Sequence, residues 1–272
     1  MKKILELTNR YIIIATPLLL FLFFISVYFM VIFRNGQFLN VLFGIVLFCL
    51  MSVAFAAGWA NMIKSAVDEK NYDEPYLIIK DFAPGVGEYF LPVLGLSCIS
   101  FLINMIIFVL IYYAGMHFIG DIGVSVEALS RAMSGQEALK VFLTSLSAEQ
   151  FSKLSSWNIL VLTTISAIYF LMMFYFPALF YETKNPFKAF FKSLRNLLGK
   201  KLLSNFGIYL LIFGINSLIS IFSALVSNNT ILSFILTLIN FYFICCVVTG
   251  IFYYYNKNFV NQHLGNTIDT YI

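Results

Sequence analysis

Long runs of apolar residues recur along the chain and are separated by shorter polar segments. Six of these runs contain no Asp, Glu, Lys, Arg or His, and each meets the requirement of about 20 residues for crossing about 30 Å of hydrocarbon. They are apolar on every side, whereas a strand of a membrane barrel alternates over about ten residues. The pattern predicts an all-α integral membrane bundle of six transmembrane helices, over residues 11–33, 38–63, 89–113, 157–181, 204–226 and 230–255.

Composition agrees with a protein whose solvent is lipid. Of the 272 residues, 61% are hydrophobic and only 11% are charged, against about 25% charged residues in an ordinary soluble domain. A globule this apolar could not cover its surface with polar groups. The net charge of +4 is far from the clustered basic footprint of a nucleic-acid binder, so we exclude nucleic acid as a partner.

Basic residues are divided unevenly between the two sets of connections. The N-terminus, the 64–88 loop, the 182–203 loop and the C-terminal tail hold 13 of the 17 Lys and Arg residues. Because cationic loops stay on the cytoplasmic side of a membrane, both termini are predicted to be cytoplasmic. The first run is too long for the core of a signal peptide and no small-residue cleavage site follows it, so it is predicted to be a retained span.

The clearest local signal for a helix lies between the fourth and fifth runs, over residues 185–199. Asn185 fits the N-cap, Pro186 the first helical position and Gly199 the end of the helix. Its apolar positions share one face, which consists of Phe187, Phe190, Phe191, Leu194, Leu197 and Leu198. Such a helix is typical of the membrane interface. The cations predicted to contact anionic lipid headgroups are Lys188, Lys192, Arg195, Lys200 and Lys201.

Two interpretations of this basic amphipathic helix stay open. It either senses or recruits lipid, or it is an anchor that orients the protein and supplies the excess of Lys and Arg that cytoplasmic loops carry.

The 114–156 connection is the longest one and is predicted to lie outside the cytoplasm. Ser134 with Glu137, and Ser147 with Gln150, have the spacing of capping boxes. We therefore expect two or three short amphipathic helices, which form a cap over the extracytoplasmic side of the bundle. Both a lid over a cavity and a purely structural cap fit this pattern.

Two cytoplasmic loops carry opposite charge. The 64–88 loop is net −3 and the 182–203 loop is net +5. Opposite potentials on adjacent loops attract, so we expect these loops to dock on each other. Two independently solvated surfaces are an equal alternative, because an exposed ion pair contributes only about 0–1 kcal/mol.

Small residues and prolines predict how the spans pack. Ala54 and Gly58 are four residues apart, a spacing that lets helices approach closely and places the second span inside the bundle. Pro17, Pro92 and Pro177 predict kinks in the first, third and fourth spans.

The polar residues inside the runs are all uncharged. Asn104, Asn216 and Asn240 each lie near the centre of a predicted span, and an amide in hydrocarbon needs a partner. These asparagines fit interhelical hydrogen bonds worth about 0.6–2 kcal/mol each, or a neutral polar lining for a substrate headgroup. No carboxylate, His or Lys is predicted at membrane depth, where ion-coupled transporters usually keep one.

Candidate chemistry is scarce. All four cysteines fall inside predicted spans, and His117 and His263 lie on opposite sides of the predicted membrane. These positions argue against a disulfide framework and a two-histidine zinc site. The sequence therefore predicts no catalytic residue, no metal site and no cofactor.

Residues 177–199 carry a resemblance to known proteins. The run Phe176-Pro177-Ala178-Leu179-Phe180-Tyr181-Glu182, followed by Pro186, Ala189, Ser193, Leu194 and Gly199, resembles the end of the fourth span and the next helix in a group of bacterial six-span membrane proteins. That group includes the membrane domain attached to some glycerophosphodiester phosphodiesterases and several families of unknown function. The resemblance implies a bacterial cytoplasmic-membrane protein without catalysis of its own, and no functional residue carries over.

These features together predict a non-enzymatic multi-pass protein of the bacterial inner membrane, which acts as a scaffold or accessory factor in envelope or lipid homeostasis. The alternative is a transporter or flippase-like carrier for an uncharged or amphiphilic substrate, which would use the central asparagines and the extracytoplasmic loop. Membrane lipids are the expected partners. A protein partner and a second copy of the chain both stay open.

Overall fold

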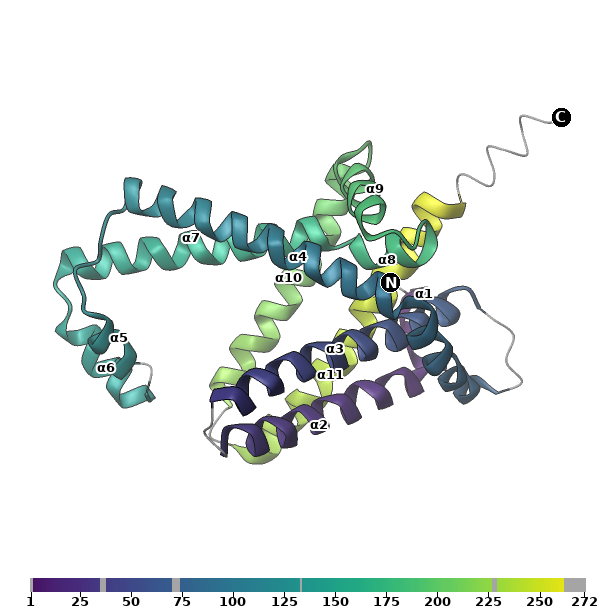
Figure 1. Cartoon of the computed structure of the whole chain (residues 1–272), viewed down its shortest axis with the longest axis horizontal. Helices are drawn as coiled ribbons and strands as arrows, with labels where there is room; N and C mark the ends of the chain where they lie inside the picture. Colours follow the sequence, from purple (N-terminus) through teal and green to yellow (C-terminus); the bar gives the residue numbers. More distant parts are fainter. Residues whose placement is uncertain (1, 35–37, 70–73, 133, 227–228, 262–272) are drawn as a thin grey trace. The chain divides into compact units, whose positions relative to one another are not determined.

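The computed structural model describes residues 2–34, 38–69, 74–132, 134–226 and 229–261 (Figure 1). Every regular element within those residues is a helix. Six helical segments are long and apolar enough to cross a membrane, which confirms an all-α multi-pass membrane protein. These segments contain α2 (Ala15–Arg34), α3 (Phe38–Val67), α4 (Phe82–Phe118), α7 (Ala148–Met172) with α8 (Tyr175–Tyr181), α10 (Leu202–Leu225) and α11 (Thr230–Tyr255).

The chain divides into two compact units. A single transmembrane domain over residues 1–272 stays a prediction of the sequence. The first unit consists of Met1–Ile99 and Leu171–Ile272, and the second consists of Ser100–Phe170. Helices α4 and α7 each contribute residues to both units.

The first unit begins with a helix that the sequence analysis missed. Helix α1 (Lys2–Arg10) packs against α11, where Ile4 lies 3.4 Å from the position that a Cβ of Gly250 would take. The Tyr242 hydroxyl donates a hydrogen bond of 2.6 Å to Asn9 Oδ1. On its exposed side, α1 pairs Lys3 with a carboxylate after α3, Glu69, at 2.8 Å, and that hydrogen bond raises the pKa of Lys3. The beginning of the chain and its last span are thus tied together.

Helix α3 lies beside α2 and α11 (Figure 1). Its C-terminal half is in the core, since Ala57, Met62 and Ile63 are fully buried, but its N-terminal half exposes residues such as Leu39. The ring of Phe82 lies 2.9 Å from the position of a Gly58 Cβ. The prediction that the second span packs inside the bundle therefore holds for its C-terminal half only.

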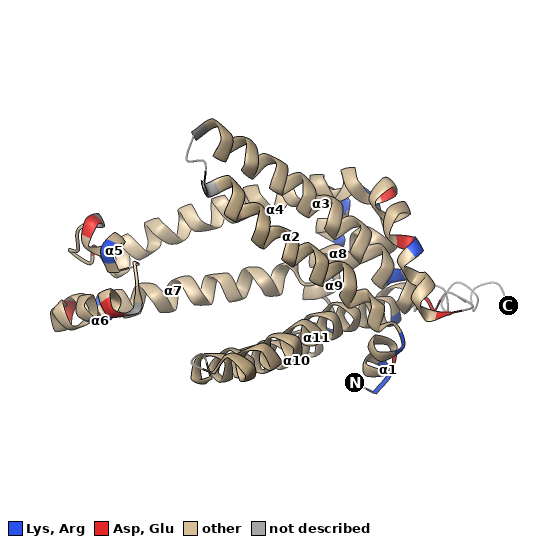
Figure 2. Ribbon diagram, turned by 90° about the horizontal axis from the view of Figure 1, so that it is seen from below, with Lys and Arg blue, Asp and Glu red and all other residues tan. Residues whose placement is uncertain are grey.

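Charged residues of the first unit gather on the side where the N-terminus lies (Figure 2). The long middle parts of α2, α3, α10 and α11 contain no charged residue and expose large apolar side chains. Exposed apolar surface of this extent marks the faces that contact lipid.

The fourth predicted span is interrupted near Pro177. Helix α7 ends at Met172 and α8 begins at Tyr175. A proline has no N–H for the carbonyl four residues earlier and its ring clashes with that carbonyl, which explains a break four residues upstream. Pro17 lies in the first turn of α2, directly after a short 3₁₀ turn, whereas Pro92 lies within the continuous helix α4.

The second unit contains two short helices between the long ones, α5 (Val126–Ala132) and α6 (Gln136–Ser145). The capping box of Ser147 and Gln150 is confirmed, because each backbone N–H donates to the other side chain, at 3.0 and 3.2 Å. The predicted box of Ser134 and Glu137 is wrong. Residue Gly135 is the N-cap of α6, and the Ser134 hydroxyl instead donates backward to the carbonyl of Arg131 at 2.7 Å.

Candidate functional site

The segment from α8 to α9 (Pro186–Leu198) joins the other helices of the first unit. Helix α8 packs against α9, α3 and α11, and its residues Ala178, Leu179 and Phe180 are buried. The ring of Phe180 stacks on Tyr89 of α4 with centroids 4.1 Å apart. These contacts connect the short segment Tyr175–Leu198 to helices from both ends of the chain. We therefore take this segment as the candidate site.

A carboxylate lies at the centre of this segment. Glu182 Oε1 accepts hydrogen bonds from Asn196 Nδ2 at 2.9 Å and from the Tyr255 hydroxyl. Its other oxygen, Oε2, lies 3.0 Å from Lys192 Nζ. Because hydrogen bonds to an ionised group are about twice as strong as neutral ones, this set, which we call the Glu182 network, holds α9 against the end of α11.

A second amide completes the end of α9. Asn205 of α10 is fully buried, and its Nδ2 donates to the backbone carbonyls of Asn196 and Leu197 at 3.1 and 2.8 Å. Its Oδ1 accepts from the Tyr254 hydroxyl at 2.9 Å. The last carbonyls of a helix have no intrahelical partner, so Asn205 supplies the donors that they need and joins α9, α10 and α11.

Gly199 is the C-cap of α9, at the predicted position but for a different reason. Its φ of −76° and ψ of −156° are extended, so the left-handed conformation usual for a terminal glycine is absent. The requirement for glycine comes from space, because a Cβ there would lie 2.8 Å from the carbonyl oxygen of Arg195.

The acidic and basic loops meet, which confirms their predicted docking. Glu88 forms an ion pair of 2.8 Å with Lys184, and both side chains are about half exposed. In the same acidic loop, Asp68 Oδ1 accepts hydrogen bonds from the Tyr181 hydroxyl and from Asn256 Nδ2, each at 3.0 Å. Contact therefore depends on a few specific pairs and on aromatic hydroxyls, rather than on opposite net charge spread over the two loops.

The start of α9 matches the sequence prediction. Asn185 is the N-cap, its Oδ1 accepts from the backbone N–H of Lys188 at 3.1 Å, and Pro186 is the first helical residue.

We expect Asn185→Ala to destabilise the folded protein by about 1 kcal/mol, because an N-cap of this kind satisfies one otherwise unpaired N–H. The measurement is the midpoint of helix loss in a detergent titration of the purified protein. Asn185→Asp is the control, since its carboxylate accepts the same bond. Equal losses for both variants would contradict the capping role.

The predicted single apolar face of α9 is divided into two in the structure. Leu197 is buried against the protein together with Ala189 and Ser193, whereas Phe187 and Phe191 are 63% and 66% exposed. Successive residues of a helix are rotated by about 100° around its axis, which places the buried and the exposed apolar stripes side by side. An amphipathic pattern alone therefore does not show which of the two stripes contacts protein.

The five predicted lipid-contact cations have different surroundings. Lys192 pairs with Glu182, and Lys201 Nζ donates to Asn258 Oδ1 at 2.9 Å. Lys188, Arg195 and Lys200 are exposed, and no carboxylate in the described part of the chain lies within ion-pair distance of them.

The three central asparagines are distributed over the two units. In the first unit, Asn216 is exposed and Asn240 is half-buried, and neither side chain forms a hydrogen bond with the described residues. In the second unit, Asn104 lines a hollow of about 450 Å³, and its Oδ1 is enclosed without a hydrogen-bond partner among the described residues. Interhelical bonds of these amides stay a prediction.

Sequence analysis did not single out the residues that build the Glu182 network and its neighbours. The missed polar residues are Asp68, Glu182, Asn196, Asn205, Tyr254, Tyr255 and Asn256. A signal was present in the consecutive tyrosines before Asn256 at the end of the last run. Tyrosines at the end of a span are typical of an aromatic belt at the membrane surface, but a tyrosine hydroxyl also pairs readily with a carboxylate.

No protein-family model, curated protein or solved structure matches this chain. The resemblance of residues 177–199 to the bacterial six-span group therefore stays a prediction. Within the described residues, no group of three His, Cys, Asp or Glu side chains is placed to hold a metal ion.

Proposed function

We propose that this chain is a non-enzymatic scaffold or accessory factor of the bacterial inner membrane, which acts in envelope or lipid homeostasis. Both termini lie in the cytoplasm, and α9 rests on the anionic headgroups of the inner leaflet. One observation supports this proposal most directly: α9 has a protein-facing side, an exposed apolar side and an exposed cationic side.

The three sides of α9 suit a helix that lies in the plane of the interface. Phe187 and Phe191 lie about 40° apart around the helix and are exposed, as rings that enter the acyl boundary must be. Lys188 and Arg195 lie on the neighbouring exposed sector, where headgroups meet the helix. Because the Glu182 network fixes the remaining side, α9 presents both groups in one orientation.

The expected strength of this contact follows from the exposed cations. Each cation near an anionic leaflet contributes about 1 kcal/mol, and salt screens the contribution. Lys188, Arg195 and Lys200 have no carboxylate partner in the described residues, so together they supply about 3 kcal/mol at low salt.

We expect the triple variant Lys188→Gln, Arg195→Gln, Lys200→Gln to lose anionic phospholipid from the purified protein, roughly 100-fold at low salt, as about 3 kcal/mol predicts. The measurement is lipid mass spectrometry of protein extracted from mixed anionic and zwitterionic bilayers. A control with the same charge change replaces Arg131, Lys140 and Lys153 by Gln in the 114–156 connection. Undiminished enrichment of anionic lipid in the first variant would overturn the lipid contact.

Affinity purification with mass spectrometry of proteins and lipids tests the scaffold role itself. A stoichiometric protein partner supports it, and loss of that partner in the triple variant would show that α9 orients the complex. The absence of any stoichiometric protein partner would overturn the scaffold role.

A carrier for an uncharged or amphiphilic substrate is the second candidate function. The hollow beside Asn104, with its unpartnered oxygen, favours it, because a neutral polar group at membrane depth suits such a substrate.

A further inference from the structure

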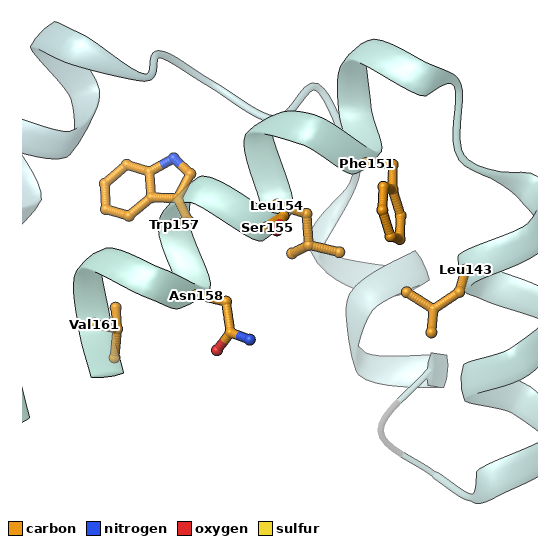
Figure 3. A pocket seen from close by; sticks show the side chains of 7 residues that line it. All are labelled: Leu143, Phe151, Leu154, Ser155, Trp157, Asn158 and Val161. Carbon is orange, nitrogen blue, oxygen red and sulfur yellow. The ribbon is translucent and has the colours of Figure 1, made fainter. Parts of the chain in front are cut away.

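Two hollows of the second unit lie along α7. The first, of about 440 Å³, is lined by Leu143 of α6 and by α7 residues that include Phe151, Asn158 and Val161 (Figure 3). The second, of about 450 Å³, lies between α4 and α7 and is the one lined by Asn104. Each is within the usual size range of ligand pockets, about 300–1,000 Å³.

Both hollows use the same face of α7. The α7 residues that line them include Leu154, Asn158, Val161, Ile165 and Ile168, which are separated by steps of four, three, four and three. Residues with this spacing form one stripe along a helix. Val161 of the first hollow and Ile165 of the second are one turn apart, so the two hollows follow one another along α7. We call them together the α7 groove.

One end of the groove is closed by a junction between α4, the loop after it and α7. There the indole of Trp157 packs on Gly115, and its Nε1 donates to the carbonyl of Gly120 at 3.0 Å. Gln150 Nε2 donates to the carbonyl of Gly123 at 3.1 Å. Gly120 and Gly123 have φ values of +80° and +70°, which non-glycine residues rarely adopt, so the turn that allows this junction is built into the sequence.

Polar groups mark two positions along an otherwise apolar groove. Ser155 and Asn158 line its first hollow, and Figure 3 shows the Asn158 amide directed away from the α7 backbone. Asn104 lies in the second hollow among Phe101, Phe108 and other apolar residues. A buried acceptor without a donor costs about 1–3 kcal/mol, and an amide can turn about its broad terminal torsion to reach a ligand.

The length of the groove fits one hydrocarbon chain of one leaflet. Asn158 and Tyr169 are 11 residues apart on a continuous helix, which corresponds to about 16 Å. Half of a hydrocarbon core of about 30 Å is close to that value. An occupant with its polar head at Asn158 would therefore place the far end of its chain near Tyr169 and Asn104.

We propose that the α7 groove binds an amphiphile with a single hydrocarbon chain. The head is hydrogen-bonded at Ser155 and Asn158, the chain lies over Val161 and Ile165, and a hydroxyl at the far end of the chain pairs with Asn104. The unpartnered oxygen of Asn104 distinguishes this site from ordinary lipid contact, since a plain hydrocarbon chain leaves that oxygen unsatisfied. The site lies beyond the proposed scaffold role and does not depend on it.

The test uses the full chain in nanodiscs with palmitic acid that carries a photoreactive diazirine in its chain, and maps the labelled residues by mass spectrometry. Labelling is expected to concentrate on the groove residues of α4 and α7. Val161→Trp fills the groove and should reduce this labelling at least fivefold. Leu162→Trp is the matched control, because Leu162 is the next residue of α7, is 58% exposed and does not line either hollow.

Competition separates the role of Asn104 from simple burial of a chain. Unlabelled 16-hydroxypalmitic acid should compete about fivefold better than palmitic acid, as one added hydrogen bond of about 1 kcal/mol predicts. Asn104→Leu should remove that difference and keep the labelling.

Labelling spread evenly over exposed apolar residues, including Leu162, would mean lipid contact only and would overturn the site. If Val161→Trp fails to fold, Asn158→Leu gives the same decision through loss of labelling. The Lys188, Arg195 and Lys200 triple variant should label normally, so failure of the scaffold proposal would leave this result unchanged.

Discussion

Replacing Glu182 by Leu should lower the free energy of unfolding by about 3 kcal/mol. The change removes the acceptor of the Tyr255 hydroxyl and of Asn196 Nδ2, and it leaves Lys192 without its ion pair. Breaking a buried pair costs about 3–5 kcal/mol, and the lower end applies because Lys192 is half exposed. The measurement is the shift in the midpoint of reversible helix loss during titration with a denaturing detergent.

Two matched variants separate the Glu182 network from a general effect of charge. Glu182→Gln keeps one carbonyl oxygen as an acceptor and should cost about 1 kcal/mol. Glu149→Leu removes a carboxylate that is 77% exposed and pairs with Lys153 one turn away, so its expected cost is below about 1 kcal/mol. If Glu182→Leu were no more harmful than Glu149→Leu, the network would not stabilise the fold.

Gly85→Ala should destabilise the protein by about 2 kcal/mol, whereas Gly87→Ala should not. A Cβ on Gly85 would lie 2.5 Å from the Asn61 Cβ and 3.1 Å from the carbonyl oxygen of Ala57. Neither atom can move without shifting α3, and inserting a methyl into a packed interior costs about 1–3 kcal/mol. The same detergent titration measures the effect.

Gly87 is the control because it lies two residues further along α4 and has no atom within 4 Å of its Cβ position. Alanine is favoured over glycine inside a helix by up to about 1 kcal/mol, so Gly87→Ala should be neutral or stabilising. Similar effects of the two substitutions would argue that α3 and α4 do not approach each other as closely as described.

The apolar runs were sufficient to predict the helices that cross the membrane, since length and the absence of charge determine that assignment. They could not predict α1, because it has only nine residues, six of them polar or charged, and so falls outside any test for a span. Its position is decided by tertiary contact with α11, through Ile4 and Asn9. Local pattern carries no information about a partner more than 200 residues away.

The same limit explains which parts of the candidate site were found. Asn185, Pro186 and Gly199 act on their own helix, so the sequence near them suffices. Glu182 and Asn205 act on other helices, and one sequence does not show which donors meet which acceptors. The ion pair of Lys192 was missed for the same reason, because its partner Glu182 precedes α9 and lies outside the pattern of that helix.

The order of synthesis gives the long-range hydrogen bonds a further consequence. Asn9 meets Tyr242 across 233 positions, Asp68 meets Asn256 across 188, and Glu182 meets Tyr255 across 73. Each of the three waits for the final helix to leave the ribosome and enter the bilayer. Until then Asn9, Asp68 and Glu182 lack their partners from the last helices, so these three bonds form after the rest of the unit has been synthesised.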